Sequence, residues 1–277
     1  MRFARSSLLL VVLLLALPTL CPAQDSGFLA NWLHQVSRIQ AEQPGWVTPV
    51  ATVTPRLEQE VRFDLFDQAL PTGRDLVNLD GGKGLEFIPA QNVEVLVNAP
   101  PYLLRHNPDV PDGFGDASFL VKYRLLSANA EKGDYIVTAF LGASLPTGTN
   151  RNGALSAIVT PTIAAGKGWG RFDVQSTLGV GLPTGHGDLL GHPLAFNSAF
   201  QYRVLGRVFP EVEVNSTFYH GGTLDGKKQV FLTPGIVVGK LPIHNRVGLT
   251  LGAGFQIAAS SYHAWNHALI VTIRMPF

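Results

Sequence analysis

Few residues of this chain have the types and spacing that catalysis or metal binding requires. His263 and His267 stand four apart, a metal-binding spacing on a helix, but on a strand they lie about 13 Å apart, too far for one ion. His186 and His192 flank Asp188 in a glycine-rich stretch, which we interpret as a solvated loop. The Gly-x-Ser-x-Gly elbow of serine hydrolases is absent. We therefore expect no catalytic residue, no metal and no cofactor.

Charged residues alternate instead with apolar ones, which is the pattern of a strand with two unlike faces. From Arg56 to Leu65 one parity reads Arg, Glu, Glu, Arg, Asp, and the other reads Leu, Gln, Val, Phe, Leu. Successive strand side chains point to opposite faces. In a membrane barrel the apolar face meets lipid and the polar face meets the lumen. We expect a lumen lined by Glu58, Glu60, Arg62, Asp64, Glu94, Lys122, Arg124, Arg171, Asp173, Arg203, Glu211, Glu213 and Arg274.

These lumen residues carry both signs of charge, which leaves two interpretations open. Rings of charge line the constriction of many ion-selective pores. Alternatively, the charges pair across the barrel and fill it, because a barrel of about twelve strands is too narrow for a wide channel. We favour pairing, and the passage of a small or apolar solute is compatible with it.

The elements that position these residues are strands, since the same alternation recurs as far as Phe277. Leu269, Val271, Ile273 and Met275 share the parity of this last residue. The sequence predicts an all-β, antiparallel transmembrane β-barrel of about twelve strands, with ten as the alternative. We expect strands near 46–54, 56–69, 86–98, 116–127, 134–146, 153–166, 171–183, 194–206, 208–220, 229–241, 246–258 and 265–277. Pro49 and Pro55 interrupt the first two, and 70–85 is a long connection between strands.

The N-terminus has the three parts of a secretory signal peptide, residues 1–23. Arg2 and Arg5 precede an apolar run of ten residues, which is too short for the alternative, a transmembrane anchor. Cys21 also suggests a lipoprotein signal, but the residue before it is not small. Residues 24–45 then form a helical segment, with apolar side chains at helical spacing from Phe28 to Gln40. We expect a short amphipathic helix, in the periplasm or at the membrane interface, before the barrel of 46–277. The alternative is a plug that enters the barrel.

Composition narrows the class of protein further. Charged residues are 15% of the chain, against roughly 25% in soluble domains. No apolar run after the signal peptide is long enough for a membrane helix. Without residues 1–23 the chain has 19 Lys+Arg and 20 Asp+Glu, a net charge of −1, which gives no reason to expect nucleic acid as a partner. The only cysteine, Cys21, leaves with the signal peptide, so the mature chain has no disulfide.

Several short motifs resemble those of one family of barrels. The segment Gly113-Phe-Gly-Asp116, followed by Lys122-Tyr-Arg124, resembles a segment of the putative MetA-pathway of phenol degradation family. The segment 85–101 is similar to the preceding strand in those proteins, and Leu-Pro-Thr-Gly at 145–148 and 182–185 to their strand-end turns. The resemblance would cover most of 46–277. It implies an outer-membrane barrel that moves apolar or aromatic compounds, and it supplies no catalytic residues.

From these observations we expect an outer-membrane channel or transporter for small, hydrophobic or aromatic molecules. Its partners would be outer-membrane lipid, a small-molecule solute and, through the C-terminal strand, the barrel-assembly machinery. Two alternatives stay open. One is a structural or adhesive barrel whose loops 98–115 and 183–194 bind an outside partner. The other is a barrel-embedded hydrolase.

Overall fold

The computed structural model describes residues 26–80, 84–107 and 109–277. The signal peptide expected at 1–23 lies outside the described residues. Helix α2 (Ser26–Ala41) confirms the short N-terminal amphipathic helix. The chain divides into two compact units between Ser37 and Arg38, and the second unit contains all the strands. None of the described helices is long and apolar enough to cross a membrane.

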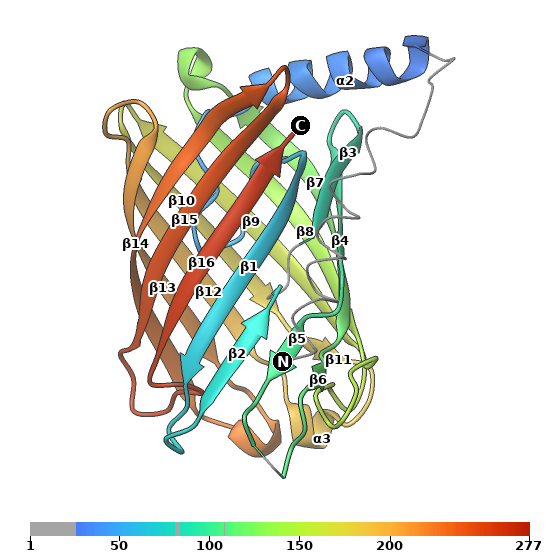
Figure 1. Ribbon diagram of the computed structural model, residues 1–277, viewed down its shortest axis with the longest axis vertical. Helices are drawn as coiled ribbons and strands as arrows, with labels where there is room; N and C mark the ends of the chain where they lie inside the picture. Colours follow the sequence, from blue (N-terminus) through green and yellow to red (C-terminus); the bar gives the residue numbers. More distant parts are fainter. Residues whose placement is uncertain (1–25, 81–83, 108) are drawn as a thin grey trace, which may run out of the picture. The chain divides into compact units, whose positions relative to one another are not determined.

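The second unit is a closed antiparallel β-barrel (Figure 1), which confirms the predicted fold class. Short helical turns lie in three of its connections: η2 (Ala130–Lys132), α3 (Gly187–Leu190) and η3 (Gly222–Leu224). Its strands are β1 (Glu60–Ala69), β2 (Asp75–Leu79), β3 (Leu85–Ala90), β4 (Val93–Asn98), β5 (Tyr102–Leu104), β6 (Gly113–Phe114), β7 (Ala117–Ala128), β8 (Tyr135–Leu145), β9 (Ile158–Trp169), β10 (Phe172–Val180), β11 (Leu182–Pro183), β12 (Leu194–Tyr202), β13 (Val208–Phe218), β14 (Lys228–His244), β15 (Val247–Ala258) and β16 (His267–Pro276).

These segments fill 12 positions in the wall of the barrel. Four positions hold two segments of one interrupted strand: β2 with β3, β4 with β5, β6 with β7, and β10 with β11. Each neighbour in the ring is antiparallel. The ring closes where β1 pairs with β16, in register from Glu60 opposite Pro276 to Ala69 opposite His267. Closure leaves no free sheet edge in the ring, so the wall satisfies its own backbone hydrogen bonds.

The predicted number of strands is correct, but three predicted segments near the N-terminus differ from the structure. Residues 46–54 form no strand, and the strand expected at 56–69 begins only at Glu60. Residues 70–85, expected to be a connection, contain a tight turn and then β2, which pairs with β1. The glycines at 81, 82 and 84 follow β2 and obscure the alternation in the sequence. Pro49 lacks the N–H group that a strand at 46–54 would need.

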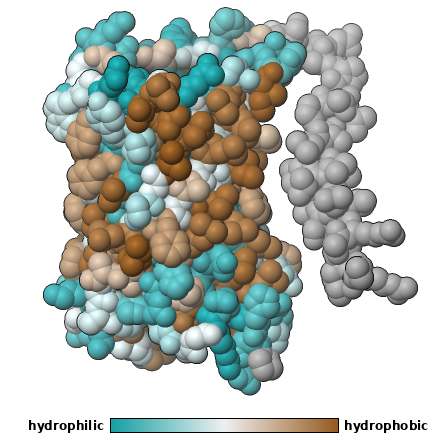
Figure 2. Space-filling view, turned by 60° about the vertical axis from the view of Figure 1, so that its left-hand side comes forward, coloured by the Kyte–Doolittle hydropathy of each residue, from teal (hydrophilic) through white to brown (hydrophobic). Residues whose placement is uncertain are grey.

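Side chains alternate between the two faces of the wall as the sequence predicts. On β15, Leu251, Phe255 and Ile257 are exposed on the outside, whereas Thr250 and Gln256 are buried in the lumen. Figure 2 shows the result on one face of the barrel, where apolar side chains cover the middle and hydrophilic ones gather toward both ends. An apolar band between two polar rims is the surface that a lipid bilayer requires.

The two ends of the barrel differ in the length of their connections. Short turns, such as 91–92, 170–171 and 245–246, lie at the end where β16 finishes, which we call the short-turn end. Longer connections, such as 105–112, 146–157, 184–193 and 219–227, lie at the opposite, long-loop end. The Leu-Pro-Thr-Gly sequence occurs three times, at 70–73, 145–148 and 182–185, and all three turns lie at the long-loop end. The first of them closes the β1–β2 hairpin, where Leu70 N–H donates to the Arg74 carbonyl over 2.8 Å.

Asp116, the acidic residue of the Gly-Phe-Gly-Asp motif, organises the loop 146–157. Its carboxylate accepts hydrogen bonds from the backbone N–H of Gly148 over 2.9 Å and of Ala154 over 2.7 Å. A Cβ at Gly148 would lie 2.4 Å from the Gly153 Cα, so only glycine fits there while the loop stays folded. The second Leu-Pro-Thr-Gly turn is therefore part of a packed loop.

We predict that Gly148→Ala loosens the loop 146–157, because the added methyl group overlaps backbone that cannot rotate away. Overpacking of this kind costs about 1–3 kcal/mol. Hydrogen exchange of the Gly148 and Ala154 amides should accelerate by about tenfold or more. Gly185→Ala is the matched control, because this glycine ends the third copy of the same motif and its Cβ would meet only Ser156 at 3.7 Å. Equal effects of the two substitutions would contradict this account of the loop.

Candidate functional site

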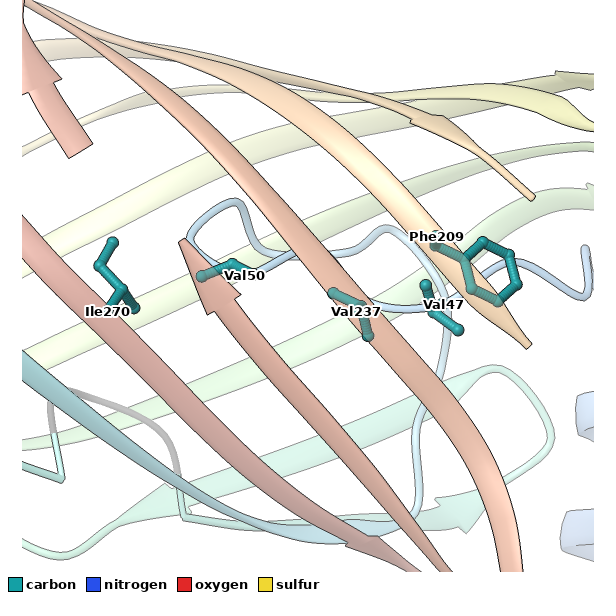
Figure 3. Packing of buried hydrophobic residues seen from close by; sticks show 5 residues of the cluster. All are labelled: Val47, Val50, Phe209, Val237 and Ile270. Atoms are coloured by element: carbon teal, nitrogen blue, oxygen red, sulfur yellow. The ribbon is translucent and has the colours of Figure 1, made fainter. Parts of the chain in front are cut away.

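The lumen of the barrel is occupied by the segment Gly45–Gln59, which we call the plug segment. It runs between helix α2 and strand β1 and contacts side chains from strands all around the wall. Val47 and Val50 of the plug segment are buried with Phe209, Val237 and Ile270 of the wall (Figure 3). The part of the second unit that occupies the lumen is therefore the irregular segment that follows helix α2 in the sequence.

Two wall arginines bind carbonyl groups of the plug segment. Arg62 on β1 and Arg274 on β16 are register partners across the seam where the barrel closes. Arg62 Nη2 donates to the Val50 carbonyl and Arg274 Nη2 to the Pro49 carbonyl, both over 2.7 Å. Arg274 Nη1 also donates to the Thr48 carbonyl. Both side chains are buried, so these carbonyls, with Asp64 at 2.8 Å from Arg62 Nε, replace the water that the guanidinium groups lose.

Two wall glutamates bind N–H groups of the same stretch from another part of the barrel. On β13, Glu211 Oε1 accepts from the Val50 N–H over 2.8 Å. Glu213 accepts from the Ala51 N–H over 2.7 Å and from the Thr52 N–H over 2.6 Å. Hydrogen bonds to a charged acceptor are stronger than neutral ones. We call residues 48–52 the tip of the plug segment. Wall carboxylates bind its N–H groups, and wall guanidinium groups bind its carbonyl groups.

A third group of charged side chains binds residues 56–58, close to the end of the plug segment. Lys122 Nζ lies 2.9 Å from Glu94 Oε1 and donates to the Arg56 carbonyl over 3.1 Å. Glu94 also accepts from the backbone N–H of Glu58. Glu58 itself belongs to the plug segment, where it lies 2.9 Å from Arg56 Nη1, and not to a wall strand as predicted. These ion pairs join close neighbours: Arg56 and Glu58 within the plug segment, and Lys122 and Glu94 on adjacent strands.

Arg124 fixes the point at which the plug segment begins. Its Nη1 donates to the Ile39 carbonyl over 2.9 Å, and its Nη2 lies 3.3 Å from Glu42. The last carbonyl groups of a helix have no partner within the helix, so Arg124 on β7 satisfies one of those of α2. Trp46, the second residue of the plug segment, donates from Nε1 to Asp134 over 3.1 Å. Its ring lies so close to Gly166 that a Cβ there would meet it at 2.5 Å.

The remaining predicted residues lie in three places. Glu60 is buried in the lumen beside the plug segment, and Asp173 is buried on β10, where it accepts from Gln175 over 3.1 Å. Arg171 and Arg203 are exposed in turns at the short-turn end. With Asp173 and Trp46 they line a mouth cavity of about 60 Å³ at that end. These two arginines thus line the mouth of the barrel and not the occupied lumen.

Sequence reasoning missed several residues that hold the plug segment. Gln175 donates to the Val47 carbonyl over 2.9 Å, and Thr138 donates to the Pro55 carbonyl over 2.6 Å. Both residues lie at inward positions of their strands, which the sequence pattern indicates. Neither is charged, and the predicted lumen residues were all charged ones. Trp46 was missed because its segment was predicted to be a strand. The main-chain groups that the wall binds carry no signal in the sequence.

Beside the plug segment, the described wall and plug residues lie close together. Among the described residues, Thr48, Arg56, Glu58, Glu60, Lys240 and Arg274 enclose a cavity of about 10 Å³. A single water molecule needs roughly that volume. At this level of the lumen, the described residues leave space for about one water molecule.

Comparison with solved structures places the fold among outer-membrane channels. The "COG4313 outer membrane channel from Pseudomonas putida F1" has a TM-score of 0.58 and 12% identity, covering 84% of this chain and 100% of that chain. The NanC porin has a TM-score of 0.52 and 7% identity, covering 78% of this chain and 98% of that chain. At such identities the likeness shows the fold alone. No family model and no curated protein matches the sequence, so the resemblance to the putative MetA-pathway of phenol degradation family stays a prediction.

We predict that Glu213→Gln loosens the tip of the plug segment. The amide has one acceptor oxygen for two donors, so one N–H of Ala51 or Thr52 loses a charge-assisted hydrogen bond, worth about 1.5–3 kcal/mol. Hydrogen exchange of these two amides should accelerate by about tenfold to a hundredfold. The control is Glu131→Gln, an exposed residue in a short turn. Unchanged protection of both amides in Glu213→Gln would show that the carboxylate does not hold the tip.

Proposed function

We propose that the protein is an outer-membrane channel for small molecules whose passage is closed by the plug segment and opens when that segment leaves the lumen. The observation that carries the proposal is the way the plug is held. Backbone groups from Thr48 to Thr52 are bound by the charged side chains of Arg62, Arg274, Glu211 and Glu213. When the segment leaves the lumen, water can form hydrogen bonds with its backbone groups and with the charged wall side chains. The segment can therefore leave without unfolding the wall.

The surface of the barrel supports the location. Large apolar side chains are exposed on the outward face of strand after strand, among them Leu141, Ile163, Phe200, Val212 and Ile273. In water such a belt would drive aggregation, whereas in a bilayer it is the stable surface. The fold shared with outer-membrane channels agrees with this location. We infer that the C-terminal strand, β16, is the segment that the barrel-assembly machinery receives.

The position of the plug's two ends supports a direction of opening. One end follows helix α2 and is fixed at Trp46 and Asp134, beside the short turn 129–134. The other end leads into β1, whose first residue pairs with Pro276. Both ends lie at the short-turn end of the barrel, so the segment can swing out only there. A barrel with its short turns in the periplasm would therefore open toward the periplasm.

The solute that we propose is small and hydrophobic or aromatic. Its support is the part of the lumen beyond the tip of the plug, where Leu96, Leu120 and Val53 line a cavity without charged side chains. We propose no enzymatic activity, because the fold is shared with channels and the buried charges that could serve as catalysts are engaged with the plug segment.

A reversible cross-link between plug and wall tests the proposal. Val50 and Val237 pack together, since both would lie 3.3 Å from a Cβ at Gly252. Val50→Cys/Val237→Cys would introduce the only two cysteines after Cys21. In planar bilayers we expect opening events from the reduced double variant and almost none after oxidation, with recovery on reduction.

The single variant Val237→Cys controls for effects of the oxidant, and liposome swelling with a small neutral solute provides an independent measurement. Combining the cysteine pair with Glu213→Gln should raise the conductance of the reduced form and leave that of the oxidised form low. The proposal fails if the oxidised double variant conducts as well as the reduced one, or if neither the wild type nor Glu213→Gln conducts or admits solute.

A further inference from the structure

A cavity of about 210 Å³ lies between the tip of the plug segment and the long-loop end of the barrel. We call it the outer vestibule. Val53 of the plug segment, Leu96 of β4 and Leu120 of β7 supply apolar walls. Ser118, Ser144 and Thr160 supply three hydroxyl groups from three neighbouring strands. The cavity is thus built jointly by the wall and by the movable segment.

The lining of the outer vestibule is uncharged although the lumen below it is densely charged. Lys122 follows Leu120 by two residues on β7, and Glu94 precedes Leu96 by two residues on β4. Both charged residues are therefore nearer the short-turn end than the cavity is. They are paired with each other at 2.9 Å, and Lys122 also binds the Arg56 carbonyl. A charged ligand would therefore find no counter-ion in the cavity and would lose its hydration. The lining selects uncharged molecules.

Polar groups of the outer vestibule allow one or two hydrogen bonds to a ligand. Ser118 Oγ accepts from Asn98 Nδ2 over 2.6 Å, which leaves its own proton to donate. The hydroxyl groups of Ser144 and Thr160 line the cavity alongside it. An apolar cavity of about 150 Å³ holds benzene, so the larger outer vestibule accommodates a six-membered ring with one polar substituent.

We propose that the outer vestibule is a binding site for a small uncharged molecule with an apolar, ring-sized body and one hydroxyl group, and that its occupation holds the plug in place. This inference rests on the proposed function, because it assumes that the plug segment moves. The site is complete only while Val53 forms its floor, so a bound molecule interacts more favourably with the plugged state than with the open one. Ligand binding must then shift the equilibrium toward the plugged state.

Binding can be measured without any transport. Full-length protein in lipid nanodiscs, with valine methyl groups labelled, is titrated with cyclohexanol, and the Val53 resonance is assigned with Val53→Ile. We expect a saturable shift of the Val53 methyl signals. Cyclohexanecarboxylate, which has a similar ring and a charge, should bind at least tenfold more weakly. A linear, non-saturating response to cyclohexanol would overturn the site.

Two variants of strand β8 separate binding in the cavity from general effects of the alcohol. Gly142→Leu should abolish the shift, because a Cβ there meets only ordinary contacts at 3.6–3.7 Å and the rest of the side chain fills the cavity. Ala139→Leu, on the outward face of the same strand, should leave the titration unchanged. The site is likewise overturned if Gly142→Leu binds cyclohexanol as the wild type does.

The coupling to the plug has its own measurement. At ten times its dissociation constant, cyclohexanol should slow hydrogen exchange of the Ala51 and Thr52 amides by about tenfold, and in Gly142→Leu it should not. Saturable binding without slower exchange would refute the coupling and retain the site. A channel that conducts but shows no saturable Val53 shift would refute the site and retain the proposed function.

Discussion

The contact between the Arg62 and Arg274 side chains and the carbonyl groups of the plug segment is the interaction on which the other features depend. The two arginines face each other across the seam of the barrel, where two like charges repel. Burial removes the water that would otherwise separate them. Carbonyl groups of Thr48, Pro49 and Val50 supply the missing acceptors. The seam and the plugged lumen therefore stabilise each other.

Recognition of the plug segment is mainly recognition of its backbone. Glu211 and Glu213 take its N–H groups, and the arginines take its carbonyls. The two prolines of the segment suit this arrangement, because they supply a carbonyl and have no N–H that needs a partner. Side chains of the segment contribute as well. Val47 and Val50 are buried, Trp46 donates to Asp134, and the Thr54 hydroxyl donates to Gln175 over 2.7 Å.

The wall of the barrel could be predicted from the sequence, and the plug could not. Alternation gave the fold class, the number of strands and the inward parity of charged residues such as Lys122 and Glu213, because it follows directly from strand geometry. The same parity misplaced Arg56 and Glu58, which continue the alternation of β1 although they belong to the plug segment. Hydrogen bonds between plug backbone and wall side chains link residues as distant as Val50 and Glu211. They depend on the closed ring, and no local sequence pattern predicts them.

The place of the plug segment in the chain has a consequence for the order of assembly. It directly precedes β1, whereas Arg274 lies in the last strand to be made. Arg62 and the plug's carbonyls are thus neighbours in the sequence long before β16 arrives to close the ring. The final strand then meets a half-built site that already presents acceptors for its guanidinium group. Pairing of β16 with β1 brings Arg274 to the carbonyl groups of Thr48 and Pro49, so closure of the ring and occupation of the lumen are coupled.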